Sequence, residues 1–122
     1  MIELVNLWVE QVNRKLTLRT LIKNLCFSFQ LRIEKRDIIL EIDKGMINLE
    51  ATPRVLPQPK RLEGSEELFL SIILGEKKLR EAVKSNEITT TFSFRELLLM
   101  ETLFYLGKPE LLSEFATKTN LY

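Results

Sequence analysis

SEELFLSIILGEKKLREAVKSNEITTTFSFRELLLMETLFYLG, residues 65–107, predicts a helix, a glycine stop, a second helix, a strand and a third helix. Ser65 followed by two glutamates is typical of a helix start, and Gly75 supplies the left-handed residue that commonly ends one. The third helix opens with the capping-box pattern S-x-x-E at Ser93 and Glu96 and runs to Gly107. Because it is apolar nearly all round, it needs cover on more than one side, from protein or from a ligand.

The middle of this stretch is more polar. Residues 76–84 predict the second helix, and Asn86 tolerates the left-handed turn that leads into a strand over residues 87–93. Charges at four-residue spacing in the helix predict surface ion pairs. The pairs are Glu76 with Arg80 and Lys77 with Glu81.

Upstream, apolar residues at helical spacing predict an amphipathic helix over residues 1–16, and residues 17–24 read as a short helical turn. The period then changes to two, and residues 26–51 predict three strands with tight turns at 35–36 and 44–45. Connections this short join only antiparallel neighbours, so the segment is a meander. We expect its polar face to be solvated, its apolar face to pack on the helices, and Cys26 to pack within the first strand.

Two further segments flank the stretch. Residues 52–64 hold three of the four prolines and predict a loop from sheet to helix. Its cations, Arg54, Lys60 and Arg61, are either ordinary solvated charges or candidates to meet an acidic head group. Residues 109–117 predict a short tail helix.

Composition limits the classes of function. The 122 residues, 45% of them hydrophobic, predict one domain with a real core. A formal net charge of +1 argues against nucleic-acid binding, and the absence of histidine excludes His-dependent zinc sites and Ser-His-Asp triads. A single cysteine and no leader or apolar run of membrane-spanning length favour a soluble protein of the reducing cytoplasm.

From about Phe27 to Leu106 the order of these elements resembles the sterol carrier protein type 2 (SCP-2) family. A three-stranded antiparallel segment leads through a loop into a helix ending in glycine, SEELFLSIILG, and AVKSNEITTTF matches the following short helix, turn and strand. Asn86 stands where glycine is usual, and Phe92 stands near a second common glycine. The resemblance implies an α+β fold in residues 1–122, with a largely antiparallel sheet of about five strands, helices on one face, and an apolar tunnel for fatty acyl chains, acyl-CoA or sterols.

The function that follows is noncatalytic binding or carriage of an apolar lipid, without cofactor or metal. Affinity would come from the buried chain and orientation from a few polar groups at the mouth. The alternative for the same residues is an ordinary filled core. The candidate cavity residues are Phe69, Ile72, Ile73, Phe92, Leu98, Leu99 and Phe104, with Leu112 and Phe115 of the tail as a lid.

Other classes of function stay open on the sequence. The main alternative is an interaction module that forms a homodimer or docks to an enzyme through an exposed apolar strip on the first helix or the tail. Transient contact of the first helix with a membrane surface is a related option. A small enzyme could use Glu101 as an acid, although a lone carboxylate in such a helix is more often partnered by Lys, Arg or a backbone group.

Overall fold

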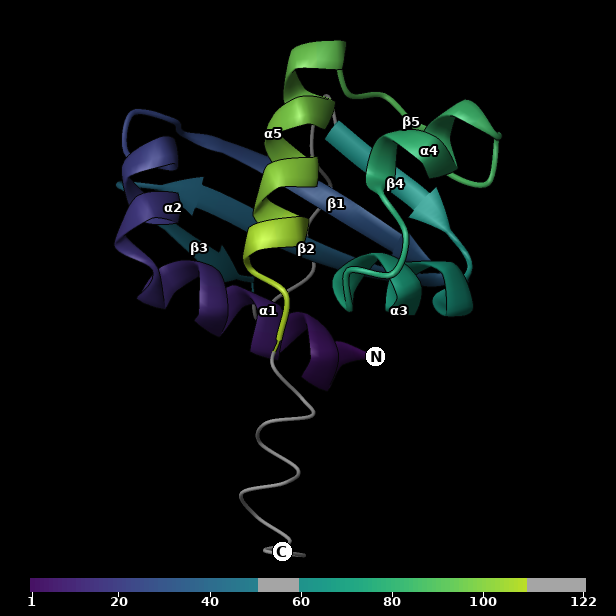
Figure 1. Cartoon of the computed structure of the whole chain (residues 1–122), viewed down its shortest axis with the longest axis horizontal. Coiled ribbons are helices and arrows are strands. Elements are labelled where there is room, and N and C mark those ends of the chain that lie inside the picture. The colour runs from purple at the N-terminus through teal and green to yellow at the C-terminus, as the bar shows by residue number, and fades with distance from the viewer. Residues whose placement is uncertain (51–59, 110–122) are drawn as a thin grey trace, which may run out of the picture.

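The computed structural model describes residues 1–50 and 60–109, which form one sheet with helices against it (Figure 1). The sheet has five strands in the order β3-β2-β1-β4-β5. The strands are β1 (Phe27–Ile33), β2 (Arg36–Asp43), β3 (Met46–Leu49), β4 (Lys60–Gly64) and β5 (Thr89–Thr90). The helices are α1 (Ile2–Arg14), α2 (Leu16–Ile22), α3 (Glu66–Ile73), α4 (Leu79–Lys84) and α5 (Phe94–Leu106).

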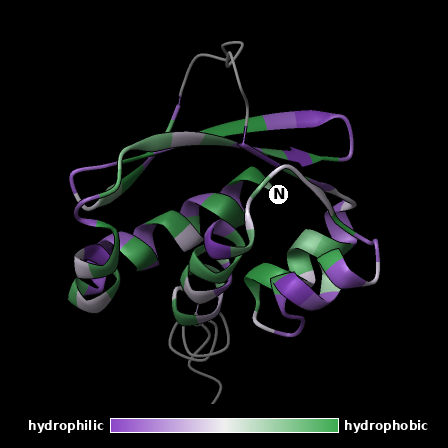
Figure 2. Ribbon diagram, turned by 90° about the horizontal axis from the view of Figure 1, so that it is seen from above, coloured by the Kyte–Doolittle hydropathy of each residue, from purple (hydrophilic) through white to green (hydrophobic). Residues whose placement is uncertain are grey.

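All the helices lie on one face of the sheet (Figure 2). Alternate residues of β1, namely Phe29, Leu31 and Ile33, are buried in the core that the helices cover. The residues between them are polar, because successive side chains of a strand point to opposite faces. The α+β architecture with helices on one face is therefore confirmed.

The first three strands form the predicted antiparallel meander. Both tight turns use left-handed backbone: Glu34 has φ of 58° in the first, and Lys44 and Gly45 have φ of 53° and 76° in the second. The first turn places a non-glycine residue in a region that side chains usually avoid. The Glu34 carboxylate accepts a hydrogen bond from the backbone N–H of Glu66, at 3.0 Å, and so ties this turn to the start of α3.

The prediction of a loop over residues 52–64 is wrong for its last five residues, because Lys60–Gly64 forms β4. This strand runs parallel to β1, with Leu31 opposite Leu62, and it separates β1 from β5. The segment KRLEG has one inward apolar residue, so it shows no alternating pattern. Backbone hydrogen bonding to a neighbour that is distant in sequence makes it a strand.

The N-terminal helical region agrees with prediction apart from its bounds. The buried face of α1 consists of Val5, Trp8, Val9 and Val12. The turn expected over residues 17–24 is the seven-residue helix α2, which buries Leu18 and Ile22. Cys26 does not pack in the sheet as expected, because β1 begins one residue later and the cysteine is exposed.

The caps of the later helices form as predicted. The Ser65 hydroxyl accepts from the backbone N–H of Leu68 at 3.2 Å, and Ser93 and Glu96 make both bonds of the capping box. Gly75 and Asn86 have φ of 81° and 63°, so both left-handed turns are confirmed.

The predictions of the second helix over residues 76–84 and of its ion pairs are wrong in part. The helix α4 begins at Leu79, since the backbone N–H groups of Glu76 and Lys77 both bond to the carbonyl of Ser71. Both residues thus lie in a turn, where four-residue spacing does not bring their side chains to Arg80 and Glu81. Lys77 pairs with Glu87 instead, and Arg80 pairs with Glu101 at 2.8 Å.

The strand predicted over residues 87–93 is shorter, with only Thr89 and Thr90 in the ladder to β4. Ile88 and Phe92 are buried while Thr89 is exposed, so the apolar residues of this segment face the core. The predicted tail helix over residues 109–117 lies, beyond Pro109, outside the described residues.

Candidate functional site

Most of the predicted cavity residues lie in the core between helices and sheet. Of those that the structure describes, Leu98 is 37% exposed and Leu99 is partly buried against the core. The buried ones are Phe69, Ile72, Ile73, Phe92 and Phe104. Leu112 and Phe115 lie outside the described residues. Their common role as the lining of a ligand cavity stays a prediction.

Two of these residues border a very small hollow. Ile72 and Phe104 line a space of about 10 Å³ between α3, α4 and α5, together with Leu79 and Glu101. That volume corresponds to about one water molecule. An acyl chain would therefore have to displace side chains to enter here.

Trp8 anchors α5 on α1. Its ring stacks on Phe104, with centroids 4.5 Å apart and planes inclined by 24°, and its indole N–H donates to the carbonyl oxygen of Leu103 at 2.9 Å. Trp8 is fully buried, so the apolar face of α1 faces the core and offers no strip for docking around this residue.

The candidate head-group cations that the structure describes have carboxylate partners. Lys60 lies 3.0 Å from Glu96, and Arg61 lies 3.6 Å from Glu63. The Nε atom of Arg61 is buried and lacks a hydrogen-bond partner at normal distance. Arg54 lies outside the described residues.

Glu101 has the partner that a carboxylate in an apolar helix needs. It accepts hydrogen bonds from the backbone N–H and from the Nε atom of Arg80, at 3.2 Å and 2.8 Å. Both contacts join α4 to α5. They give Glu101 a structural role in holding these helices together.

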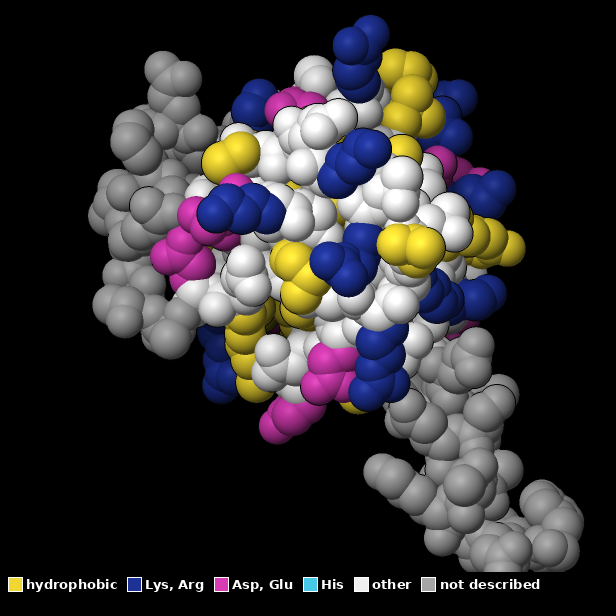
Figure 3. All heavy atoms as spheres, turned by 90° about the vertical axis from the view of Figure 1, so that its left-hand side faces the viewer, with side chains coloured by type: hydrophobic (Ala, Val, Ile, Leu, Met, Phe, Trp, Pro, Cys, Tyr) yellow, Lys and Arg dark blue, Asp and Glu magenta, His cyan; other side chains and the backbone are white. Residues whose placement is uncertain are grey.

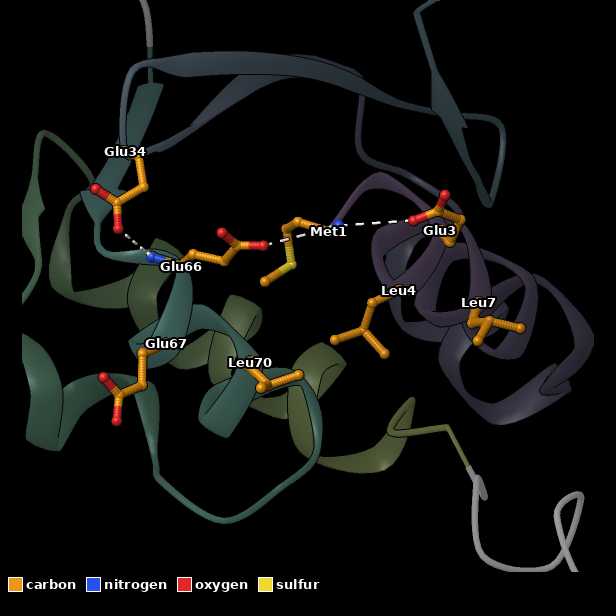
Figure 4. A pocket seen from close by; sticks show the side chains of 8 residues that line it. All are labelled: Met1, Glu3, Leu4, Leu7, Glu34, Glu66, Glu67 and Leu70. Atoms are coloured by element: carbon orange, nitrogen blue, oxygen red, sulfur yellow. Dashed lines mark hydrogen bonds and ion pairs between the residues drawn. The ribbon is translucent and has the colours of Figure 1, made fainter.

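The sequence did not indicate the hollow between α1, α3 and the turn after β1 (Figure 4). It has a volume of about 640 Å³, within the usual range of about 300 to 1,000 Å³ for small-molecule sites. Its apolar walls are Met1, Leu4, Leu7 and Leu70. Its carboxylates are Glu3, Glu34, Glu66 and Glu67. Leu70 is 42% exposed, whereas the predicted cavity residues of α3, Phe69, Ile72 and Ile73, are buried.

A second hollow adjoins the first and shares Met1, Glu34 and Glu66 with it. Its volume is about 790 Å³, and Ile2, Ile33 and Ile38 line it. Lys35, Arg36 and Asp37 complete its border. Met1 therefore lies at the border between two apolar-walled spaces.

Within residues 1–50 and 60–109, no cluster of Cys, Asp and Glu has an arrangement that could hold a metal ion. No helix in the same residues has both the length and the apolar character needed to cross a bilayer.

Three carboxylates, those of Asp37, Glu87 and Glu96, have lowered pKa values. Hydrogen bonds from Arg32 lower the pKa of Asp37, and hydrogen bonds from Lys77 and Ser85 lower that of Glu87. Burial raises the pKa of Glu96, but its hydrogen bonds with Ser93 and Lys60 outweigh this and lower the pKa overall. Asp37 borders the second hollow, whereas Glu87 and Glu96 border neither of the two.

Comparison with known proteins gives a structural match without a sequence match. No family model matches the sequence, and no curated protein does. Among solved structures, the ubiquinone synthesis protein UbiJ-SCP2 has a TM-score of 0.66 at 12% identity, over 84% of this chain and 90% of that one.

Two structures of sterol carrier proteins are also similar to this chain. A crystal structure has a TM-score of 0.65 at 9% identity, covering 87% of this chain and 94% of that one. The sterol carrier protein domain 2 of Helicoverpa armigera has a TM-score of 0.55 at 12% identity, covering 84% of each chain. Identities this low establish the fold alone. The chain therefore has the SCP-2 fold, as its order of elements predicted.

Proposed function

We propose that this protein binds the apolar part of a lipid and carries it without chemical change. The observation that carries the proposal is the apolar-walled hollow between α1 and α3, in a chain with the SCP-2 fold. The proteins of this fold named above are sterol carriers and a ubiquinone synthesis protein. Sterols and ubiquinone, the molecules in these names, are largely apolar. Fatty acyl chains, acyl-CoA and sterol-like molecules are the candidate classes.

The physical basis is burial of hydrocarbon. Each buried methylene contributes about 0.8 kcal/mol, so a chain of ten would gain roughly 8 kcal/mol before the cost of association. Leu4, Leu7 and Leu70 supply such a surface without any directional contact. Deeper insertion would reach Phe69, Ile72 and the other predicted cavity residues by moving α3 away from α5.

Native mass spectrometry of the purified protein, followed by solvent extraction, tests the proposal. A co-purified lipid at one per chain, or saturable uptake of an added long-chain lipid, is the expected result. The variant Leu70→Ser should weaken uptake, since Leu70 is 42% exposed and can be changed without disturbing the core. Leu21→Ser is the matched control, because Leu21 is similarly exposed, at 47%, and lines neither hollow. A protein that never takes up lipid would contradict the proposal.

The predicted lid needs a separate test. A chain ending after Lys108 lacks Leu112 and Phe115, and it should release bound lipid faster if these residues cover the ligand. Equal release rates in a folded truncated protein would remove the lid from the proposal.

A second candidate function rests on the exposed side of α5. Phe94, Leu98 and Tyr105 lie on one side of that helix and are 67%, 37% and 48% exposed. Arg80 lies 5.9 Å from the Phe94 ring centroid, and Lys108 lies 4.7 Å from that of Tyr105. By contrast, the face in Figure 3 carries separate hydrophobic patches among charged side chains.

The strip on α5 suits either a second copy of the chain or a membrane surface, where aromatic and cationic side chains act together. Light scattering after size exclusion and co-sedimentation with anionic phospholipid vesicles separate these partners. The variant Phe94→Glu should abolish whichever association is found. A monomer that does not bind vesicles would exclude both.

A further inference from the structure

The hollow between α1 and α3 has a negatively charged border. Four carboxylates line it, from Glu3, Glu34, Glu66 and Glu67. Among the described residues no lysine or arginine lines it, and the one cationic group at its border is the amino group of Met1, 3.6 Å from a Glu3 oxygen and 3.9 Å from a Glu66 oxygen. Figure 4 shows these carboxylates around the apolar side chains of Met1, Leu4 and Leu70.

Two of the carboxylates, those of Glu34 and Glu67, pair with no cation within residues 1–50 and 60–109. Glu34 is held by the backbone N–H of Glu66, which offers a partial charge, and Glu67 has no ion-pair partner among the described residues. The adjoining hollow does not reverse the balance, since Lys35 and Arg36 stand there against Glu34, Asp37 and Glu66. Neither border is therefore positively charged overall.

A charged head group at this position would meet these carboxylates across a partly apolar surface, where charges are screened less than in water. An anionic head group is repelled, whereas an uncharged one is tolerated and a cationic one is attracted. The two candidate head-group cations that the structure describes do not change this balance, because Lys60 and Arg61 are paired with Glu96 and Glu63 and line neither hollow.

We infer that the hollow between α1 and α3 prefers lipids whose head group is uncharged or cationic, and that its carboxylates weaken the binding of fatty acids and acyl-CoA. This inference rests on the proposed function and narrows its ligand class. It places the selectivity in Glu3, Glu34, Glu66 and Glu67 rather than in the apolar walls.

Three probes with the same dodecyl chain test the inference: dodecyltrimethylammonium, dodecanol and dodecanoate, each below its micelle-forming or solubility limit. Titration calorimetry or competition with a fluorescent lipid gives their dissociation constants. Several partly exposed charge contacts, each a fraction of a kcal/mol, predict about tenfold tighter binding of the ammonium probe than of dodecanoate at low salt. The dissociation constant of dodecanol should lie between those of the two charged probes. Added salt should reduce the differences among the three dissociation constants, because it screens the charges.

Substitutions of the lining glutamates test whether these carboxylates cause the preference among the three probes. The double variant Glu3→Gln with Glu67→Gln removes the charge of two exposed carboxylates, and it should bring the dissociation constants of the three probes closer together. Glu10→Gln is the matched control, because Glu10 is an exposed glutamate of α1 that lines neither hollow. Leu70→Ser should weaken all three probes by a similar factor, since it changes the apolar wall.

The outcomes separate the inference from the proposed function. If dodecanoate binds as tightly as the ammonium probe, or if the double variant keeps the native preference, the inference is wrong while lipid binding stands. If none of the three probes binds and no other long-chain lipid does, the proposed function fails, and the inference fails with it.

Discussion

Replacing Trp8 by phenylalanine should destabilise the protein by about 2 kcal/mol. The indole N–H donates to the Leu103 carbonyl at 2.9 Å, and this bond is fully buried. Its loss removes about 1 kcal/mol. The smaller ring keeps the stacking on Phe104, but it leaves part of the indole volume empty, and a partial cavity of this kind adds roughly 1 kcal/mol.

The total corresponds to about a 30-fold change in the folding equilibrium. Trp8→Ala also loses the ring stacking and should cost about 3 to 5 kcal/mol, the range for replacement of a buried aromatic side chain by alanine. Tyr105→Phe is the control, because Tyr105 is 48% exposed and should change stability by less than about 0.5 kcal/mol.

Urea unfolding followed by circular dichroism is the assay, because Trp8 is the sole tryptophan and fluorescence would lose its probe in the variants. A Trp8→Phe protein as stable as the native one would refute the reasoning. It would mean that Trp8 does not join α1 to α5, and the packing of α5 over the core would have to be reconsidered.

Three further predictions concern caps, turns and charges. Ser93→Ala removes the N-cap of α5 and should cost about 1 kcal/mol in urea unfolding, whereas Ser93→Thr should recover most of it. Gly75→Ala places a side chain at φ of 81° and should cost about 1 kcal/mol, while Asn86→Gly, at φ of 63°, should be neutral or stabilising; an equal effect of the two would contradict the left-handed geometry. Hydrogen bonds from Arg32 lower the pKa of Asp37, so its contribution is complete above about pH 4 and is lost as pH falls through the lowered value. Asp37→Asn should be less stable at neutral pH and should lose less further stability on acidification, and parallel pH profiles for the two proteins would show that the pair does not act in the native state.

Local patterns predicted the elements whose stability is local. The capping box at Ser93 and Glu96, the left-handed residues Gly75 and Asn86, and the alternation in β1 all depend on neighbours within a few positions. The α4 start and its ion pairs were predicted wrongly, because the turn after Gly75 bonds to Ser71 and redirects Lys77 and Arg80 to more distant partners.

The candidate site was harder to predict than the fold. Sequence reasoning selected the most apolar residues, such as Phe69, Ile72 and Phe104, and these are the residues that fill a core. The hollow between α1 and α3 is lined instead by Leu4 and Leu70, which lie on two helices far apart in sequence. Two of its glutamates, Glu66 and Glu67, were interpreted from the sequence only as part of a helix start. A pattern in one helix carries no information about what another helix places opposite it.

The sequence alone determined the class of the fold, because helix caps, turn residues and the period of apolar side chains are properties of short segments. It also determined the order of elements that resembles SCP-2. Only the tertiary structure decided that Lys60–Gly64 joins the sheet parallel to β1, and that Met1, Leu4 and Leu70 meet beside four carboxylates. Both depend on contacts between distant residues, and such contacts form only when the whole chain packs.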